Sequence, residues 1–350
     1  IKCQPCWRIG RFKRLGKYSP PPWPGGFCGF TGPLIVRWYF WTKIMKRQSF
    51  QLIFLPLLFL LLANLACMEP KDEKQEEDHP FRIIDRSPSW SPDGRAIVYY
   101  HSQSIDSTGK WSPDTSGLYL INPDGTNKRL LRIGFTHDPD WSPDGKWVVY
   151  GERGEIFKIK ANGDSLIQLT FEGRNFYPDW SPDGTKITYD RSVSDQAGKS
   201  GIWLLNSNGS ERNWIFGGAH PTWHPDGKNI IAVIGVSPVG GWKKFIRYNI
   251  NESVVQETLS VVIGNSNEHP KYSPNGNKIL FISQPYGNRH QLWVMDSDGE
   301  NQIQLTQDGG WTGDWAPSGE SIVFTNALDG RLWIMNTHGN QWRQLTFKPE

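Results

Sequence analysis

Short apolar segments separated by polar turns recur from residue 81 to the end of the chain. Some alternate apolar and polar positions, as residues 146–150 and 278–282 do, and this period is typical of half-buried β-strands. Others, such as residues 156–159 and 292–295, lead into Asn-Gly or Asp-Gly pairs, which join adjacent antiparallel strands. Because helical periodicity is nearly absent from this region, we predict an all-β domain.

One phrase divides this pattern into six units: an aromatic residue followed by a Ser-Pro-Asp-Gly-like turn. In such a turn Pro presets φ, Asp bonds its own backbone and Gly adopts positive φ. The leading aromatics lie 39 to 51 residues apart and are Trp90, Trp141, Trp180, Trp223, Tyr272 and Trp315. This period, with four strands in each unit, predicts a six-bladed β-propeller of four antiparallel strands per blade over residues 81–350.

Two places depart from the regular repeat. Residues 246–259 lack the glycine of the outer turn, so we expect a longer or irregular hairpin there. Residues 81–84 provide a seventh candidate outer strand for six blades. We therefore expect one terminus to close the last blade, with residues 81–84 beside or in place of residues 342–346, because closure removes exposed sheet edges.

The repeated segments resemble the TolB-type propeller repeat. The resemblance rests on the Trp-Ser-Pro-Asp-Gly turn, the Leu-Trp-Val-Met strand at 292–295 and the Gln-Leu-Thr ends at residues 168–170, 304–306 and 344–346. It covers residues 81–350 and implies the fold rather than a function, since one fold hosts many functions. TolB itself carries an α/β domain before its propeller, whereas here residues 68–80 stand between the preceding apolar run and the first blade.

A basic and then apolar run precedes the propeller. Residues 45–66 begin with Met-Lys-Arg and continue into an almost wholly apolar stretch, which predicts a secretory signal peptide. Cys67 follows directly and resembles the modified residue of a bacterial lipoprotein, which implies a lipidated Cys67 and export to the cell envelope, on the outer membrane. An uncleaved membrane anchor and ordinary signal-peptide cleavage are the alternatives.

We interpret residues 67–80 as a lipidated Cys with a flexible tether and residues 1–44 as a non-native upstream extension.

The charge balance depends on this division of the chain. All 350 residues carry a net charge of +3, but residues 67–350 hold 28 Lys and Arg against 35 Asp and Glu. A basic face, which nucleic-acid binding requires, is therefore not supported. Cys67 is the single cysteine in that part of the sequence, so no internal disulfide is expected.

Catalytic motifs are missing from the sequence, and the repeat alignment offers candidate site residues instead. Neither a Gly-x-Ser-x-Gly elbow nor a phosphate-binding glycine loop occurs. The third residue before each leading aromatic begins an innermost strand and should ring one mouth of the central channel: Ser87, Asp138, Tyr177, His220, His269 and Thr312. The fourth residue before it should lie beside that ring: Arg86, His137, Phe176, Ala219, Glu268 and Trp311.

From these positions we select a candidate face for a ligand or partner. Loops between second and third strands should open on the same side, and loops carried on a rigid scaffold often hold the function. The selected residues are His137, Asp138, His220, Glu268 and His269, with Trp111 and Trp242 of those loops on the rim.

The sequence supports two hypotheses of different class. The first is a monomeric, non-catalytic, envelope-anchored propeller that binds a protein partner or an envelope glycan and needs no cofactor. The alternative is a metal-dependent polysaccharide lyase with His220 and His269 as candidate metal ligands. It follows from the similarity of the repeats to those of propeller-type oligogalacturonide lyases, which implies a histidine-rich metal site in the channel. A structural interpretation stands beside both: a His before Pro can simply bond the end of an inner strand.

Overall fold

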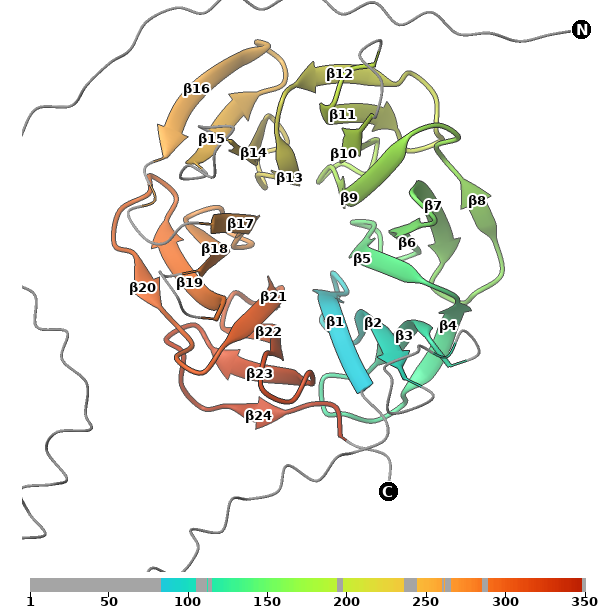
Figure 1. The fold of residues 1–350 in the computed structure, drawn as a ribbon, viewed down its shortest axis with the longest axis vertical. Coiled ribbons are helices and arrows are strands. Elements are labelled where there is room, and N and C mark those ends of the chain that lie inside the picture. The colour runs from blue at the N-terminus through green and yellow to red at the C-terminus, as the bar shows by residue number, and fades with distance from the viewer. Residues whose placement is uncertain are drawn as a thin grey trace, which may run out of the picture. The chain divides into compact units, whose positions relative to one another are not determined.

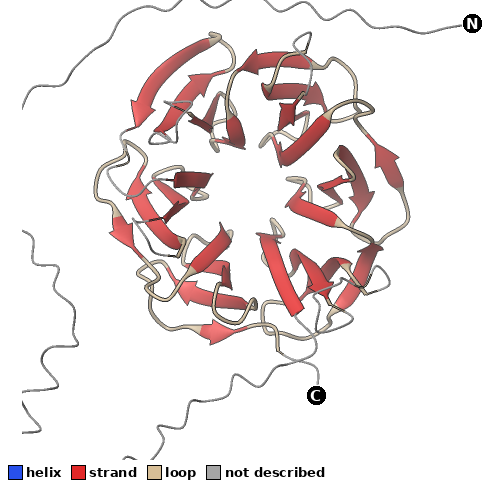
Figure 2. Ribbon diagram, in the orientation of Figure 1, coloured by secondary structure: helices blue, strands red, loops and turns tan. Residues whose placement is uncertain are grey.

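The computed structural model describes residues 83–104, 112, 115–193, 198–235, 244–259, 261, 266–284 and 289–347. These residues form 24 strands arranged in six four-stranded antiparallel sheets, which confirms the predicted six-bladed propeller. Figure 2 shows strands and loops throughout these ranges, and within them no helix is long and apolar enough to cross a membrane.

Each blade is built from four consecutive strands (Figure 1). Blades 1 and 2 contain β1 (Ile83–Trp90), β2 (Ile97–Gln103), β3 (Gly117–Ile121), β4 (Arg129–Ile133), β5 (Thr136–Trp141), β6 (Trp147–Glu152), β7 (Glu155–Lys160) and β8 (Leu166–Gln168). Blades 3 and 4 contain β9 (Arg174–Trp180), β10 (Lys186–Ser192), β11 (Gly201–Asn206), β12 (Asn213–Phe216), β13 (Ala219–Trp223), β14 (Asn229–Ile234), β15 (Lys244–Asn249) and β16 (Val254–Leu259). Blades 5 and 6 contain β17 (Ser266–Tyr272), β18 (Lys278–Gln284), β19 (Gln291–Asp296), β20 (Ile303–Gln304), β21 (Gly310–Trp315), β22 (Ser321–Asn326), β23 (Leu332–Asn336) and β24 (Arg343–Gln344).

The hydrophobic core lies between neighbouring blades. The first strand of each blade stands nearest the central axis and the fourth lies at the rim (Figure 1). One apolar cluster joins Ile231 and Phe245 of blade 4 to Phe281 of blade 5, and all three side chains are buried. Another joins Tyr99 of blade 1 to Leu332 of blade 6, so the same packing continues across the two ends of the ring. Burial of one large side chain contributes roughly 1.5–3 kcal/mol, which makes these repeated contacts the main stabilising term.

The Ser-Pro-Asp-Gly phrase forms the tight turn between the first and second strands, as predicted. In blade 2 the hydroxyl of Ser142 donates to Asp144 Oδ1 over 2.6 Å, and the same oxygen accepts the Lys146 N–H at 3.0 Å. Gly145 has φ +68°, which a residue with a Cβ adopts only with strain. The turn therefore satisfies its own polar groups and lets the strand reverse at once.

The Gln-Leu-Thr ends have an equally local explanation. In blade 2 the Ile156 N–H donates to the hydroxyl of Thr170 at 2.8 Å, and the Gln168 amide donates to the Thr170 carbonyl at 2.7 Å. Leu169 is buried between them. The motif thus hydrogen-bonds the end of the outer strand to the start of the third strand, and its leucine side chain packs into the apolar core.

The predicted closure of the ring by residues 81–84 is wrong. Ile83 and Ile84 begin β1, the innermost strand of blade 1, and β24 is already the fourth strand of blade 6. Besides the apolar cluster described above, polar contacts join blade 1 to blade 6: the Asp85 N–H donates to the Gly330 carbonyl at 2.8 Å, and the Trp90 N–H donates to Asp314 Oδ2 at 2.8 Å. Residues 81 and 82 lie outside the described residues.

The hairpin that lacks a turn glycine is not longer than the others. Residues 250–253 connect β15 to β16, whereas the longer segment 207–212 connects β11 to β12. Asn249 Oδ1 accepts N–H groups of Asn251 and Glu252 at 2.9 and 3.0 Å, and Ser253 has φ +57°. The side chain of Asn249 replaces the missing glycine turn, and the irregularity is a bulge opposite β15 between Arg247 and Tyr248.

Candidate functional site

Each innermost strand carries a bulge where it approaches the axis. The pairing register shifts at this point in all six blades, for example between His137 and Asp140 of β5. In five blades a residue followed by Pro has positive φ there, and these residues are Ser87 (48°), Asp138 (48°), Tyr177 (53°), His220 (51°) and His269 (51°). A bulge re-aims side chains, and strained backbone of this kind persists only where the surrounding structure holds it.

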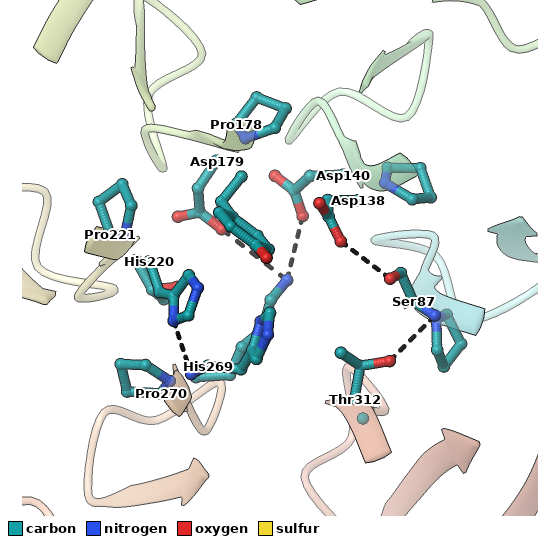
Figure 3. Close-up of a pocket in the computed structure, with 16 residues that line it drawn as sticks. Ser87, Asp138, Asp140, Pro178, Asp179, His220, Pro221, His269, Pro270 and Thr312 are labelled. Carbon is teal, nitrogen blue, oxygen red and sulfur yellow. Dashed lines mark hydrogen bonds and ion pairs between the residues drawn. The ribbon is translucent and has the colours of Figure 1, made fainter. Parts of the chain in front are cut away.

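The bulges place their side chains around the axis as the repeat alignment predicted. We call the six residues at this position the mouth ring: Ser87, Asp138, Tyr177, His220, His269 and Thr312, all of which line a cavity of about 70 Å³. Figure 3 labels five of them, and their side chains converge from separate strands: Ser87, Asp138, His220, His269 and Thr312. The Ser87 N–H bonds the Thr312 hydroxyl at 3.0 Å, and the Ser87 hydroxyl donates to Asp138 Oδ1 at 2.9 Å. The ring is therefore linked from blade 6 through blade 1 to blade 2.

Below the mouth ring an ionic cluster lies on the axis. Lys271 Nζ approaches carboxylate oxygens of Asp140, Asp179 and Asp314 at 3.3, 3.8 and 3.6 Å. Each carboxylate also accepts the backbone N–H of the leading aromatic in the next blade, at 2.8 to 2.9 Å. One lysine thus connects blades 2, 3, 5 and 6.

Burial and mutual repulsion set the protonation of this cluster. Burial, with the neighbouring Asp140 carboxylate, raises the pKa of Asp179 to about 8 against the attraction of Lys271. Burial likewise raises the pKa of Asp314. Burial alone would lower the pKa of Lys271, but the three carboxylates outweigh it and raise that pKa. Burial therefore favours the protonated form of Asp179, whereas the surrounding carboxylates favour the charged form of Lys271.

Two histidines and a tyrosine of the mouth ring form a packed aromatic group. The rings of His220 and His269 stack with centroids 4.1 Å apart and planes 13° apart. The Tyr177 ring meets both edge-on, at 4.2 and 4.9 Å. The backbone N–H of His269 donates to His220 Nδ1 at 3.4 Å, and the backbone N–H of His220 donates to Asp190 Oδ2 at 3.2 Å. Burial raises the pKa of Asp190 to about 7, partly offset by this last bond.

His137 and Asp138 form a second group at the mouth. His137 Nδ1 lies 3.1 Å from Asp138 Oδ2, and its ring lies 5.4 Å from that of Phe176. Burial works against ionisation of Asp138, but the bond and charge of His137 and the charge of His269 hold its pKa below the usual value. Gly151 of β6 makes room for the imidazole, since a Cβ there would collide with the His137 ring.

A larger cavity opens above the mouth ring, and we call it the mouth cavity. It measures about 520 Å³, and its wall includes Arg86, Phe176, Glu268, His290 and Trp311. The Arg86 guanidinium stands over the Trp311 ring, 5.4 Å from its centroid. Five of the six residues at the fourth position before the aromatics line this cavity, in agreement with the predicted placement.

The candidate metal ligands are close together but are not aimed at one point. Potential ligand atoms of His220, Glu268 and His269 all lie within 4.8 Å of one another. A metal ion lies in the plane of each imidazole that binds it, about 2.0–2.1 Å from the nitrogen. Because the two rings are stacked and nearly parallel, an ion in the plane of one is out of the plane of the other. In this arrangement the two histidines do not fit a shared ion.

The structure brings together His137, Asp138, His220, Glu268 and His269 around the two cavities. Trp111, Trp242 and Cys67 lie outside the described residues, so their predicted roles stay predictions. Sequence analysis did not select Arg86, Trp311, Asp190 or the Lys271 cluster. The residue directly before each leading aromatic would have revealed that cluster, since it is Asp140, Asp179, Lys271 and Asp314 in four of the repeats.

The fold and the site together define a six-bladed β-propeller with a polar and aromatic cavity at one channel mouth. Residues 87–312 match the family model of the TolB beta propeller domain, and the chain belongs to this family.

Individual relatives agree with this assignment. The chain is 30% identical over 223 residues to an uncharacterised protein of Agrobacterium fabrum, covering 57% of this chain and 72% of that protein. It is 28% identical over 239 residues to the Tol-Pal system protein TolB of Francisella tularensis, covering 64% of this chain. This chain spans 51% of the length of that TolB.

Solved structures show the same fold at lower identity. TolB from Acinetobacter baumannii superposes with a TM-score of 0.58 and 18% identity, over 74% of this chain and 78% of that one. Oligogalacturonate lyase in complex with manganese superposes with a TM-score of 0.50 and 15% identity, over 75% of this chain and 78% of that one. Both likenesses concern the fold.

Proposed function

We propose that this protein is a non-catalytic binding protein of the bacterial cell envelope, which holds a protein partner or an envelope glycan at the channel mouth. The mouth cavity of about 520 Å³ carries the proposal, because it combines aromatic walls with a few charged groups on rigid strands. The candidate face is that of His137, Asp138, His220, Glu268 and His269, with Trp111 and Trp242 on its rim.

Membership in the TolB propeller family and the likeness to Tol-Pal system proteins support a place in the envelope. The signal-like run of residues 45–66 followed by Cys67 supports export and a lipid anchor. The anchor is tested by fractionation: wild-type protein should remain with washed membranes, and Cys67→Ser should be released. Retention of Cys67→Ser in the membrane fraction would remove the anchor from the proposal.

Site-specific photo-crosslinking in the native envelope tests the binding face. A photoreactive phenylalanine analogue at Phe176, in the wall of the mouth cavity, should form an adduct with a partner. The same analogue at Lys228, an exposed position in a tight turn on the opposite side, is the matched control and should form none. Adducts from position 228 alone would place the binding face on the other side of the ring.

A metal-dependent polysaccharide lyase is the second candidate, favoured by the proximity of His220, Glu268 and His269. The stacking of the two imidazoles opposes it, since one ring would have to rotate before both could bind one ion. Calorimetric titration with Mn²⁺ and incubation with oligogalacturonate separate the two functions. Metal binding and product formation that are both lost in His269→Ala would establish the lyase, whereas the absence of both in the wild type would exclude it.

A further inference from the structure

Large apolar residues are exposed on the face of the ring at which the mouth cavity opens, which we call the mouth face. In each blade the first and third strands begin at this face and the second and fourth end there. Four residues on its loops and connections are more than half exposed, and we call them the apolar arc: Phe135 (52%), Phe171 (65%), Leu328 (61%) and Phe347 (65%). None of them lines the mouth cavity.

The exposure of large apolar residues is one-sided. Among the described residues, Val255 (51%) and Ile303 (53%) are the other two exposed to this degree, and both lie on outer strands at the rim. The opposite face carries the Ser-Pro-Asp-Gly-like turns and the outer turns, which are described in all six blades and contain no large apolar residue that is more than half exposed. Scattered apolar residues need no explanation, whereas a set gathered on one face indicates a contact surface.

Two members of the apolar arc flank the beginning of β1. Leu328 lies two residues before Gly330, whose carbonyl accepts the Asp85 N–H at 2.8 Å. Phe347 directly follows Thr346, whose hydroxyl donates to Asp85 Oδ2 at 2.6 Å. Both side chains therefore stand at the junction of blade 6 with blade 1.

The other two members continue the arc past blade 1. Phe135 lies in the connection from blade 1 to blade 2, and Phe171 lies in the connection from blade 2 to blade 3. The acidic neighbour of Phe171 is occupied, since a carboxylate oxygen of Glu172 lies 3.9 Å from Arg191 Nη2, and Arg174 is exposed beside it. The apolar arc thus extends from blade 6 to the junction of blades 2 and 3.

The chain enters the propeller within this arc. Ile83 begins β1 at the mouth face, and residues 67–82 precede it. With Cys67 as the lipid anchor of the proposed function, a linker of these 16 residues joins the membrane to Ile83. A flexible linker of this length has a root-mean-square end-to-end distance of roughly 20–24 Å. It would keep the mouth face at an effective concentration of about millimolar near the lipid, so that even weak surface binding becomes populated.

We propose that the apolar arc docks the propeller on the surface of the membrane that holds its lipid anchor. The side chains of Phe135, Phe171, Leu328 and Phe347 enter the boundary between headgroups and acyl chains, where exposed apolar groups gain free energy with the area they bury. Because these residues are spaced along an arc and do not surround a pocket, they suit a fluid surface better than a protein partner, whose interface needs a packed centre.

Docking by one arc tilts the ring. Blades 6, 1 and 2 face the lipid, and the side of blades 4 and 5 is raised, from which the partner of the proposed function can reach the mouth cavity. The proposal rests on the lipid anchor of that function and adds the orientation of the propeller on the membrane.

Photo-crosslinking of the full-length protein in its native envelope tests the contact. A photoreactive phenylalanine analogue at Phe135 or at Phe171 should give adducts that carry phospholipid, identified by mass spectrometry. The same analogue at Ile303, which is equally exposed and lies on β20 at the rim, is the matched control and should give far fewer.

Fractionation of the same cells keeps the anchor and the docking apart. Protein that stays with washed membranes but gives no lipid adduct at either position, adducts with protein alone, or as many lipid adducts as position 303 would overturn the docking and leave the anchor. Protein released from the membranes without lipid adducts would overturn both.

Variants test the part played by the apolar side chains. Phe171→Ser combined with Leu328→Ser should reduce the lipid adduct at position 135 roughly 10-fold or more, the range expected when two large apolar side chains lose their burial. Val255→Ser combined with Ile303→Ser is the matched control and should leave that adduct unchanged. An unchanged adduct in the first pair would overturn the docking, and so would equal losses in both pairs. A melting curve for each variant confirms that it is folded.

Discussion

The hydroxyl of Thr346 donates a hydrogen bond of 2.6 Å to Oδ2 of Asp85, and this contact joins the end of the last blade to the first strand of the ring. In blade 2 the equivalent hydroxyl, that of Thr170, donates to Glu155 Oε2 at 2.5 Å, and Asn175 of the next blade donates to the same carboxylate at 2.9 Å.

At the junction of blade 6 with blade 1, which we call the seam, the acidic side chain and its donor partner have exchanged positions. Arg331 occupies the place of Glu155, and Asp85 occupies the place of Asn175. Arg331 Nη1 lies 3.5 Å from Asp85 Oδ2, and both side chains are buried. The seam therefore has a buried Arg–Asp ion pair where the junction of blades 2 and 3 has a Glu–Asn hydrogen bond. This difference favours the pairing of blade 6 with blade 1.

Asp85→Asn should destabilise the propeller by about 3 kcal/mol or more, because it leaves the buried Arg331 charge without its partner. The double variant Asp85→Asn with Arg331→Glu recreates the arrangement at Glu155 and Asn175 and should recover most of that loss. Urea unfolding measures both. Glu320→Gln, an exposed carboxylate in a turn, is the control and should change stability little. No recovery in the double variant would refute the proposed equivalence.

Lys271→Met should lower the free energy of unfolding of the propeller, and the size of this loss should depend on pH. Removal of the ammonium leaves the carboxylates of Asp140, Asp179 and Asp314 facing one another. Burial raises the pKa values of Asp179 and Asp314, so acidification should protonate these two and the stability deficit relative to wild type should shrink from pH 8 to pH 5. Chemical unfolding at the two pH values measures it, and a deficit that grows on acidification would contradict the axial role of Lys271.

The wild-type protein should lose stability as the pH rises from about 4 towards 8. The pKa of Asp179 rises from 3.8 to about 8 on folding, and that of Asp190 to about 7, so the folded state binds more protons in this window. Each such group contributes a slope of up to roughly 1.4 kcal/mol per pH unit. Asp179→Asn and Asp190→Asn should each flatten the profile. A wild-type profile that rises across this window, and that neither substitution changes, would contradict the raised pKa values of Asp179 and Asp190.

Gly151→Ala should displace the His137 ring, since the added Cβ would occupy its place. We expect a loss of about 1–3 kcal/mol in stability from overpacking and a changed chemical shift of the His137 ring protons. Binding at the mouth cavity should weaken as well. An unchanged histidine spectrum would mean that the ring does not rest on Gly151.

Gly145→Val should cost about 1–3 kcal/mol, because the turn needs φ +68° and a β-branched residue is strained there. Gly217→Val is the matched control, since Gly217 is exposed, has no positive φ and has open space around its missing Cβ. Thermal unfolding compares the two. Equal losses would show that the positive φ of the turn is not the cause.

The repeat alone was enough to predict the blade count, the turns and the position of the mouth residues. These features follow from local chemistry: Pro, Asp and Gly determine the turn within five residues, and identical units place equivalent positions at one radius. For that reason His137, Asp138, His220, Glu268 and His269 could be assigned to one face before the fold was known.

Tertiary structure decided how the ring closes and what its axis contains. The contact between Thr346 and Asp85 spans 261 residues, and no local pattern distinguishes the end of a chain that closes a ring from one that does not. Lys271 meets carboxylates from three other blades, so its role depends on the radius at which six separate strands converge. The stacking of His220 on His269 likewise depends on a left-handed bulge in each strand, which residues without a glycine's freedom adopt only because the packed ring holds them there.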